Sequence, residues 1–154
     1  MNKEKIAFIP RQYLAVIAVL LAIMMSVLDG TIMNIALPTL AHDFDVTPST
    51  AIWIVNAYQL VITMTLLSFA SLGDIYGYRR IFLIGISIFV GASLACALSA
   101  SFWMLTAARV IQGFGAACVM SVNTALIRLI YPPQILGRGM GVNAMVVAVS
   151  AAAG

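Results

Sequence analysis

A single carboxylate inside a long apolar stretch constrains this chain more than any other feature of its sequence. No residue from Gln12 to Leu28 carries a charge, and after Asp29 none does until His42. A run of that length is enough to cross a bilayer as a helix. A carboxylate at such depth is tolerated when it faces a protein interior or a watery cavity, finds a partner or takes up a proton. We therefore predict a functional site at Asp29, with a structural tie to a neighbouring helix as the alternative.

Composition places most of the chain in the membrane. Hydrophobic residues make up 63% of the sequence and charged residues 8%, and the mean hydropathy is +1.08. This balance predicts an all-α, polytopic bundle of membrane helices. Helices are expected at about 12–38, 48–71, 81–98, 102–130 and 139–154, with Thr47 before Pro48 as the start signal of the second.

The last expected helix holds 16 uncharged residues, whereas a membrane span needs about 20. We therefore expect residues 1–154 to be the incomplete amino-terminal half of a longer protein. A four-helix protein with an interfacial tail is the alternative.

The basic residues are distributed unequally between the two sides of the predicted membrane. Seven of the eight Lys and Arg residues fall on one side of the predicted membrane: Lys3, Lys5, Arg11, Arg79, Arg80, Arg128 and Arg138. The turns assigned to the other side, near residues 42–50 and 99–101, carry none. The positive-inside rule then predicts a cytoplasmic amino terminus. Basic residues scattered singly between spans do not indicate a nucleic-acid surface. A cleaved signal peptide fits poorly, because the apolar run is too long and more spans follow.

The eighth basic residue, Arg109, lies inside the fourth predicted span. The residues that share its helical face are two amides and two small or flexible apolar groups: Gln112, Ala116, Met120 and Asn123. A face that combines a cation with amides predicts the wall of a polar cavity.

Arg109 and Asp29 are expected at similar depth in the bilayer. Asp29 is nine residues before Pro38, whereas Arg109 is seven residues after Phe102 on a helix that runs the other way. At 1.5 Å per residue the two depths agree within roughly 3 Å. If both helices face one cavity, the two charges meet there and each lowers the burial cost of the other. Burial favours a neutral carboxyl group and a guanidinium favours an ionised one, so a small movement would switch Asp29. A permanent structural ion pair is the alternative.

Two further rows of side chains follow helical spacing. The second predicted helix carries a polar stripe of Asn56, Gln59 and Thr63. This stripe either lines an aqueous path or bonds to a neighbouring helix. The third predicted helix carries small residues at intervals of four, namely Ser87, Gly91, Ala95 and Ser99. This row predicts a surface for close helix packing.

Residue clusters typical of enzymes are missing from the sequence. One histidine and two carboxylates in the turn 42–45 are a weak metal signal and fit a solvated loop. Cys96 and Cys118 are expected too far apart in depth to form a disulfide. Without a nucleophile and base pair or a glycine-rich phosphate loop, we expect no catalysis, no metal and no cofactor.

Three motifs follow one another along the chain. The stretch LDGTIMNIALP, residues 28–38, contains Asp29 and Pro38, and SLGDIYGYRRIFL covers residues 71–83. The third, LTAARVIQGFGAA, covers residues 105–117. Together they resemble the helix 1, loop 2–3 and helix 4 motifs of the major facilitator superfamily, specifically its drug:proton antiporter family with fourteen membrane helices. The loop departs from the family pattern at Ala70, Ile75 and Tyr78, where glycine, arginine and another basic residue are usual.

The resemblance implies the amino-terminal part of a transporter in the inner (plasma) membrane, for proton-coupled efflux of lipophilic, cationic drugs or toxic compounds. Asp29 and Arg109 would couple protons to transport. The loop residues Gly73, Asp74, Gly77, Arg79 and Arg80 would form a conformational gate. Together with the polar faces described above, it suggests a substrate cavity lined by Asn56, Gln59, Gln112, Met120 and Asn123.

The expected partners are a small-molecule substrate, protons and the lipid bilayer, but no nucleic acid. Participation of a periplasmic adaptor is left open. A facilitator for a specific metabolite or nutrient is the alternative within transport. A membrane scaffold or assembly protein, with buried polar groups that hold helices together, is the alternative from another class.

Overall fold

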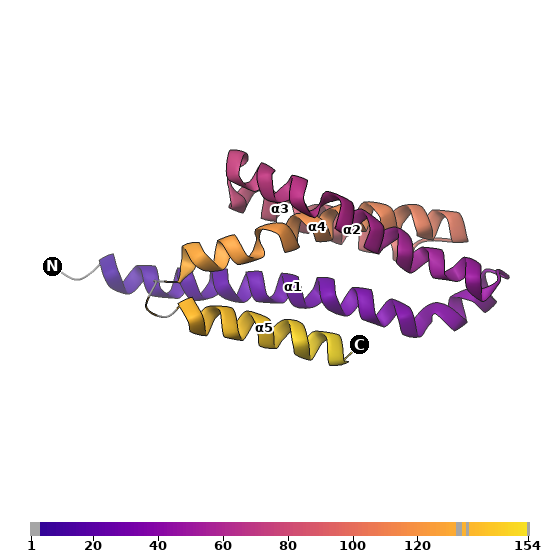
Figure 1. Cartoon of the computed structure of the whole chain (residues 1–154), viewed down its shortest axis with the longest axis horizontal. Helices are drawn as coiled ribbons and strands as arrows, with labels where there is room; N and C mark the ends of the chain where they lie inside the picture. Colours follow the sequence, from indigo (N-terminus) through magenta and orange to yellow (C-terminus); the bar gives the residue numbers. More distant parts are fainter. Residues whose placement is uncertain (1–3, 132–133, 135, 154) are drawn as a thin grey trace.

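A computed structural model describes residues 4–131, 134 and 136–153, and it folds them into five α-helices without a strand in those ranges (Figure 1). The helices are α1 (Glu4–Asp43), α2 (Pro48–Tyr76), α3 (Tyr78–Ala97), α4 (Phe102–Ile130) and α5 (Leu136–Ala153). The first four are long and apolar enough to cross a membrane. The predicted all-α membrane bundle is therefore confirmed.

The ends of α4 agree with the prediction, and local chemistry explains where it begins. The Ser101 side chain accepts a hydrogen bond from the Met104 backbone N–H, which caps the first turn. At the start of α2, the Thr47 side chain caps the helix in the same way by accepting from the Thr50 N–H.

The turn between α2 and α3 differs from the prediction. Residues 72–80 were expected to connect these helices, but α2 continues to Tyr76 and α3 begins at Tyr78. Gly77 alone separates them, with a φ of +92° that side chains rarely permit. The charged residues of this segment suggested a loop. However, residues at the ends of a helix can keep helical backbone while their charged side chains point into water. The helix α1 is likewise longer than expected, since it continues past Pro38 to Asp43.

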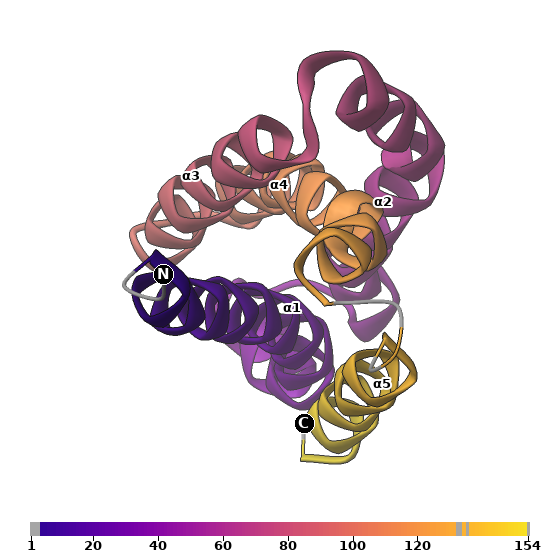
Figure 2. The same cartoon turned by 90° about the vertical axis from the view of Figure 1, so that its left-hand side faces the viewer.

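The helix α4 is the centre of the bundle. Over half of its most apolar stretch is buried inside the protein, 56%, against 17–28% for the other three candidate spans. Figure 2 shows α4 between α2 and α3, with α1 crossing below them and α5 alongside α1. This central position places the polar face of α4 against other helices.

The contact between α3 and α4 depends on two glycines. A Cβ on Gly115 would lie 2.6 Å from the Phe89 backbone nitrogen, and one on Gly85 would lie 2.6 Å from the Cys118 Cβ. The predicted packing row at Ser87, Gly91, Ala95 and Ser99 is not the row that makes this contact. Ser87 and Gly91 are exposed, and a Cβ on Gly91 would meet nothing within 4 Å among the described residues. The row that packs against α4 contains the bulky Phe89, so a search for small residues alone did not find it.

Candidate functional site

Asp29 and Arg109 meet in the middle of the bundle. Arg109 Nη1 donates a hydrogen bond of 2.6 Å to Asp29 Oδ2, which joins α4 to α1. The Arg109 side chain is 1% exposed and the Asp29 side chain 25% exposed. The meeting predicted from their depths is confirmed, while a role in proton coupling stays a prediction.

Gln112 lies one helical turn after Arg109 and forms hydrogen bonds to both members of the ion pair. Its Nε2 donates to Asp29 Oδ1 at 3.0 Å and to Ser93 Oγ of α3 at 2.7 Å, while its Oε1 accepts from Arg109 Nη1 at 2.7 Å. Both oxygens of Asp29 are therefore occupied by donors from α4. The Cys96 thiol also donates to Gln112 Oε1, at 3.6 Å. One amide thus orients the ion pair and connects it to α3.

Tyr58 of α2 completes the cluster. The Arg109 Cζ lies 4.6 Å from the centroid of its ring, and the Tyr58 hydroxyl donates to the Ser26 carbonyl of α1 at 3.2 Å. Sequence reasoning missed Tyr58, Ser93 and Cys96. A tyrosine in mid-span was the available signal, because its buried hydroxyl needs a hydrogen-bond partner. Ser93 and Cys96, three residues apart on one face of α3, gave a weaker signal.

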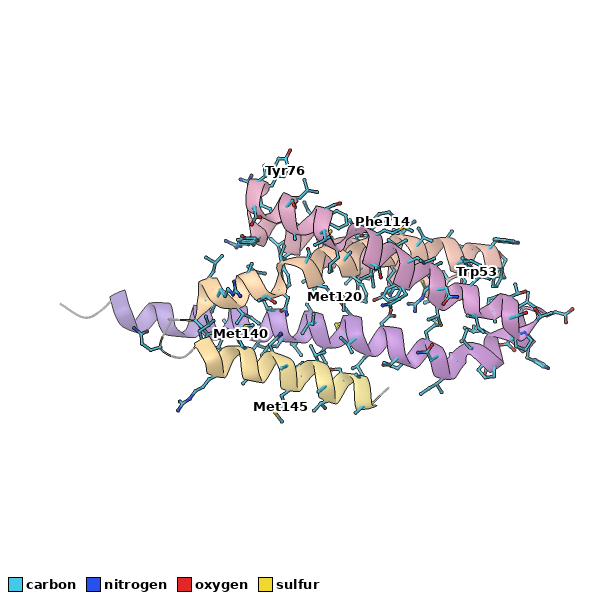
Figure 3. All side chains as sticks on the ribbon, viewed as in Figure 1. Trp53, Tyr76, Phe114, Met120, Met140 and Met145 are labelled. Carbon is cyan, nitrogen blue, oxygen red and sulfur yellow. The ribbon has the colours of Figure 1, made fainter. Side chains whose placement is uncertain are left out.

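A cavity of about 260 Å³ lies beside this cluster, between α1, α2 and α4. Ser26 and Gly30, which flank Asp29 in α1, line it together with Asn34. Gln59 lines it from α2 and Met120 from α4, and Figure 3 shows Met120 between α4 and α1. The lining residues include sequence neighbours of Asp29 and the Tyr58 ring, but not Asp29 itself, and they are uncharged polar and apolar groups.

The polar stripe of α2, Asn56, Gln59 and Thr63, lies at the surface of the described part of the chain. Asn56, Gln59 and Thr63 line a second hollow of about 280 Å³ with Trp53 and Leu60. The Thr63 hydroxyl bonds to the Gln59 carbonyl of its own helix at 2.8 Å. In the described part of the chain, no side chain of this stripe bonds to another helix. The residues that line this hollow all belong to α2, and the lining of an aqueous path by this stripe stays a prediction.

The polar face of α4 is covered by other helices at Gln112 and Asn123, and the part of these two residues in a substrate cavity stays a prediction. Both are buried: Gln112 within the ion-pair cluster, and Asn123 through a 3.0 Å hydrogen bond from its Nδ2 to Asn143 Oδ1 of α5. The reason is the central position of α4, whose polar face is covered by α1, α3 and α5. Met120 is the predicted cavity residue of this helix that reaches the cavity.

The predicted gate residues surround the single-residue turn at Gly77. The Tyr78 hydroxyl of α3 donates to Asp74 Oδ1 near the end of α2, across the turn. Arg79 and Arg80 are exposed, and neither forms an ion pair with the residues that the structure describes. A Cβ on Gly73 would lie 2.9 Å from the Tyr78 ring and 3.0 Å from Val122 of α4. The carboxylate here is held by a tyrosine at a position where the family pattern has a basic residue.

Comparisons with known proteins support one family. A family model described as Major Facilitator Superfamily matches residues 19–154. The uncharacterized transporter YebQ of Escherichia coli (strain K12) is 60% identical over 146 residues, which cover 95% of this chain and 32% of that protein. The riboflavin transporter RibZ of Clostridioides difficile (strain 630) is 34% identical, with 90% of this chain and 30% of RibZ covered.

A further relative, the drug efflux pump JefA of Mycobacterium tuberculosis (strain ATCC 25618 / H37Rv), is 40% identical over 132 residues. That match covers 85% of this chain and 26% of JefA. The chain therefore spans about a third or less of the length of these relatives.

Proposed function

The chain belongs to the Major Facilitator Superfamily, and on that premise we propose that it is the amino-terminal part of a proton-coupled exporter of lipophilic, cationic compounds. It is a multi-pass membrane protein, and we place it in the inner membrane with its amino terminus in the cytoplasm. Its relatives include a drug efflux pump, and the residues offer a carboxylate with a buried cationic partner.

The unequal burial of the ion pair carries the proposal. The Arg109 side chain is buried in the protein, whereas a quarter of the Asp29 side chain remains accessible. A proton or a cationic substrate that enters can therefore reach the carboxylate without displacing the whole cluster. Because one carboxylate cannot hold both at once, binding of the cation favours release of the proton. That competition is the minimum requirement for exchange in opposite directions.

The other residues take roles that follow from their positions. Asn56, Gln59 and Met120 contact the substrate, since they line the two hollows beside α2. A flexible methionine suits substrates of varied shape. Gln112 and Asn123 shape the cavity from behind, as buried hydrogen-bonded groups. Asp74, Arg79 and Arg80 act in the gate around the turn at Gly77. All of these proposed roles belong to transport, and none of them is catalytic.

The test is gradient-driven efflux of ethidium, a fluorescent lipophilic cation, from cells that express the full reading frame. Asp29→Asn is compared with Asp43→Asn, a matched change of an exposed carboxylate on the same helix. At equal membrane levels we expect at least a tenfold loss of efflux for Asp29→Asn and parental efflux for Asp43→Asn. Efflux that survives in Asp29→Asn contradicts the proposal. Loss of the Asp29→Asn protein from the membrane would instead favour a scaffold role.

Transport of one specific neutral metabolite is the second candidate. It is favoured by the similarity to a riboflavin transporter and by the amides Asn34 and Gln59 in the cavity wall. Amides can hydrogen-bond to the polar edge of a flat neutral compound. Riboflavin accumulation that depends on the full-length protein and persists in Asp29→Asn, without ethidium efflux, would select this candidate.

A further inference from the structure

The turn between α2 and α3 brings three helices together at one point. Gly73 of α2 is buried, and the Cβ that it lacks would lie 2.9 Å from the ring of Tyr78 in α3 and 3.0 Å from Val122 in α4. Val122 is fully buried, and the half-buried Tyr78 packs against the core cluster that contains it. The Tyr78 ring therefore occupies the space beside a glycine, between the turn and the central helix.

The hydroxyl group of this ring reaches back across the turn. It donates to Asp74 Oδ1 and so joins the first turn of α3 to the last turn of α2, on either side of Gly77. The Asp74 side chain is otherwise exposed, and it forms no ion pair in the described part of the chain. Tyr78 is therefore the side chain that limits where the Asp74 carboxylate can point.

A hydroxyl group holds a carboxylate differently from the basic residue that the family pattern has at position 78. It donates one hydrogen bond and brings no charge, so Asp74 keeps its negative charge and a second oxygen that can accept from another group. A lysine or arginine would neutralise the carboxylate, and salt would screen the exposed pair. The contact in this chain is directional and does not depend on ionic strength.

We propose that Tyr78 is a positioning residue of the gate, which holds the charged Asp74 carboxylate in place through its hydroxyl while its ring anchors the turn against α4. The inference deepens the proposed function and rests on the gate role given there to Asp74. Without the hydroxyl, Asp74 rotates in water and the turn opens more often. The carboxylate then occupies the position that the gate uses less of the time, and transport slows.

The first measurement is backbone hydrogen–deuterium exchange over residues 71–83 of the full-length protein in detergent. Tyr78→Phe keeps the ring beside Gly73 and removes the hydroxyl, so we expect exchange in this segment to rise about threefold or more. Tyr76→Phe is the matched control, because Tyr76 is an exposed tyrosine at the end of α2 (Figure 3), and it should leave exchange unchanged. In an Asp74→Ala background, Tyr78→Phe should have no further effect, since the hydroxyl acts through the carboxylate.

Salt separates a hydroxyl contact from an ion pair. Between about 0.05 M and about 0.5 M salt, the exchange of this segment in the parent should stay constant. Tyr78→Arg restores the basic residue of the family pattern, and its exchange should rise over the same range as the new ion pair is screened. Exchange in the parent that rises with salt would overturn the inference, because it would mean that a charged partner holds Asp74.

The second measurement is the initial rate of ethidium efflux at equal membrane levels. We expect Tyr78→Phe to lower this rate about threefold or more and Tyr76→Phe to keep it. Unchanged exchange in Tyr78→Phe overturns the inference, and so does raised exchange with the efflux rate of the parent. The proposed function still stands in both cases if Asp29→Asn abolishes efflux. A parent that exports no ethidium contradicts the proposed function and the gate role with it.

Discussion

Two places in this molecule combine an aspartate with arginine, one inside the bundle and one at the turn between α2 and α3. Inside, Asp29 and Arg109 are joined at 2.6 Å and bracketed by Gln112. At the turn, Asp74 is bonded to Tyr78. Water explains the difference. A buried charge requires a partner, whereas an exposed ion pair gains about 0–1 kcal/mol and need not form. The same residue types therefore give a fixed pair in one place and separately solvated groups in the other.

Breaking the interior pair should have the largest effect, and the two halves of the pair should differ. Asp29→Leu leaves a fully buried arginine that stays charged, and we expect a loss of about 3–5 kcal/mol in the free energy of unfolding. Arg109→Leu leaves a carboxyl group that is partly exposed and can take up a proton, so its cost should be smaller. Thermal unfolding of the full-length protein in detergent checks this order. Equal losses, or the reverse order, would contradict the account of the pair.

At the turn, the backbone should matter more than the charges. Gly77→Ala forces a side chain into a φ of +92°, with an expected cost of about 1–3 kcal/mol. Gly137→Ala is the matched control, because this exposed glycine of α5 has nothing within 4 Å of an added Cβ. Helix propensity makes the control neutral or slightly stabilising. Thermal unfolding of both variants in detergent would measure this difference. A Gly77→Ala protein as stable as the parent would mean that the turn tolerates another backbone geometry.

The smallest effect is expected from the charged groups of the turn. Asp74→Asn and Tyr78→Phe each remove an exposed hydrogen-bonding group, so the melting temperature should stay within the scatter of replicates. Added salt should leave this result unchanged, because no Asp74 ion pair is present to screen in the described part of the chain. A salt-dependent loss of stability in Asp74→Asn would show that the carboxylate has a charged partner.

Sequence reasoning predicted the features that depend on position along a single helix. The bounds of α4, the Thr47 cap and the equal depth of Asp29 and Arg109 all follow from local signals and a fixed rise per residue. None of these needs knowledge of which helices are neighbours. They account for the helical fold and for the centre of the candidate site.

The errors arose where the result depends on how helices face one another. The row of α3 that packs against α4 was missed because it includes Phe89, opposite Gly115. The hydrogen bond between Asn123 and Asn143 of α5 was not predicted, since a helical wheel of α4 cannot reveal which helix lies against it. Tyr58 and Ser93 were overlooked for the same reason. Each lies on a helix other than those that carry the ion pair, and spacing along one helix does not give its orientation toward another.

The ion pair also has a consequence for how the protein is made. Asp29 precedes Arg109 by 80 residues, so on a ribosome the carboxylate is synthesised first. An arginine at the centre of a newly inserted helix costs about 2.5–3.5 kcal/mol. When α4 emerges, its acidic partner in α1 is already in the bilayer and can offset that cost. The order of the two charges along the chain thus suits insertion from the amino terminus, because Asp29 is in place before Arg109 enters the membrane.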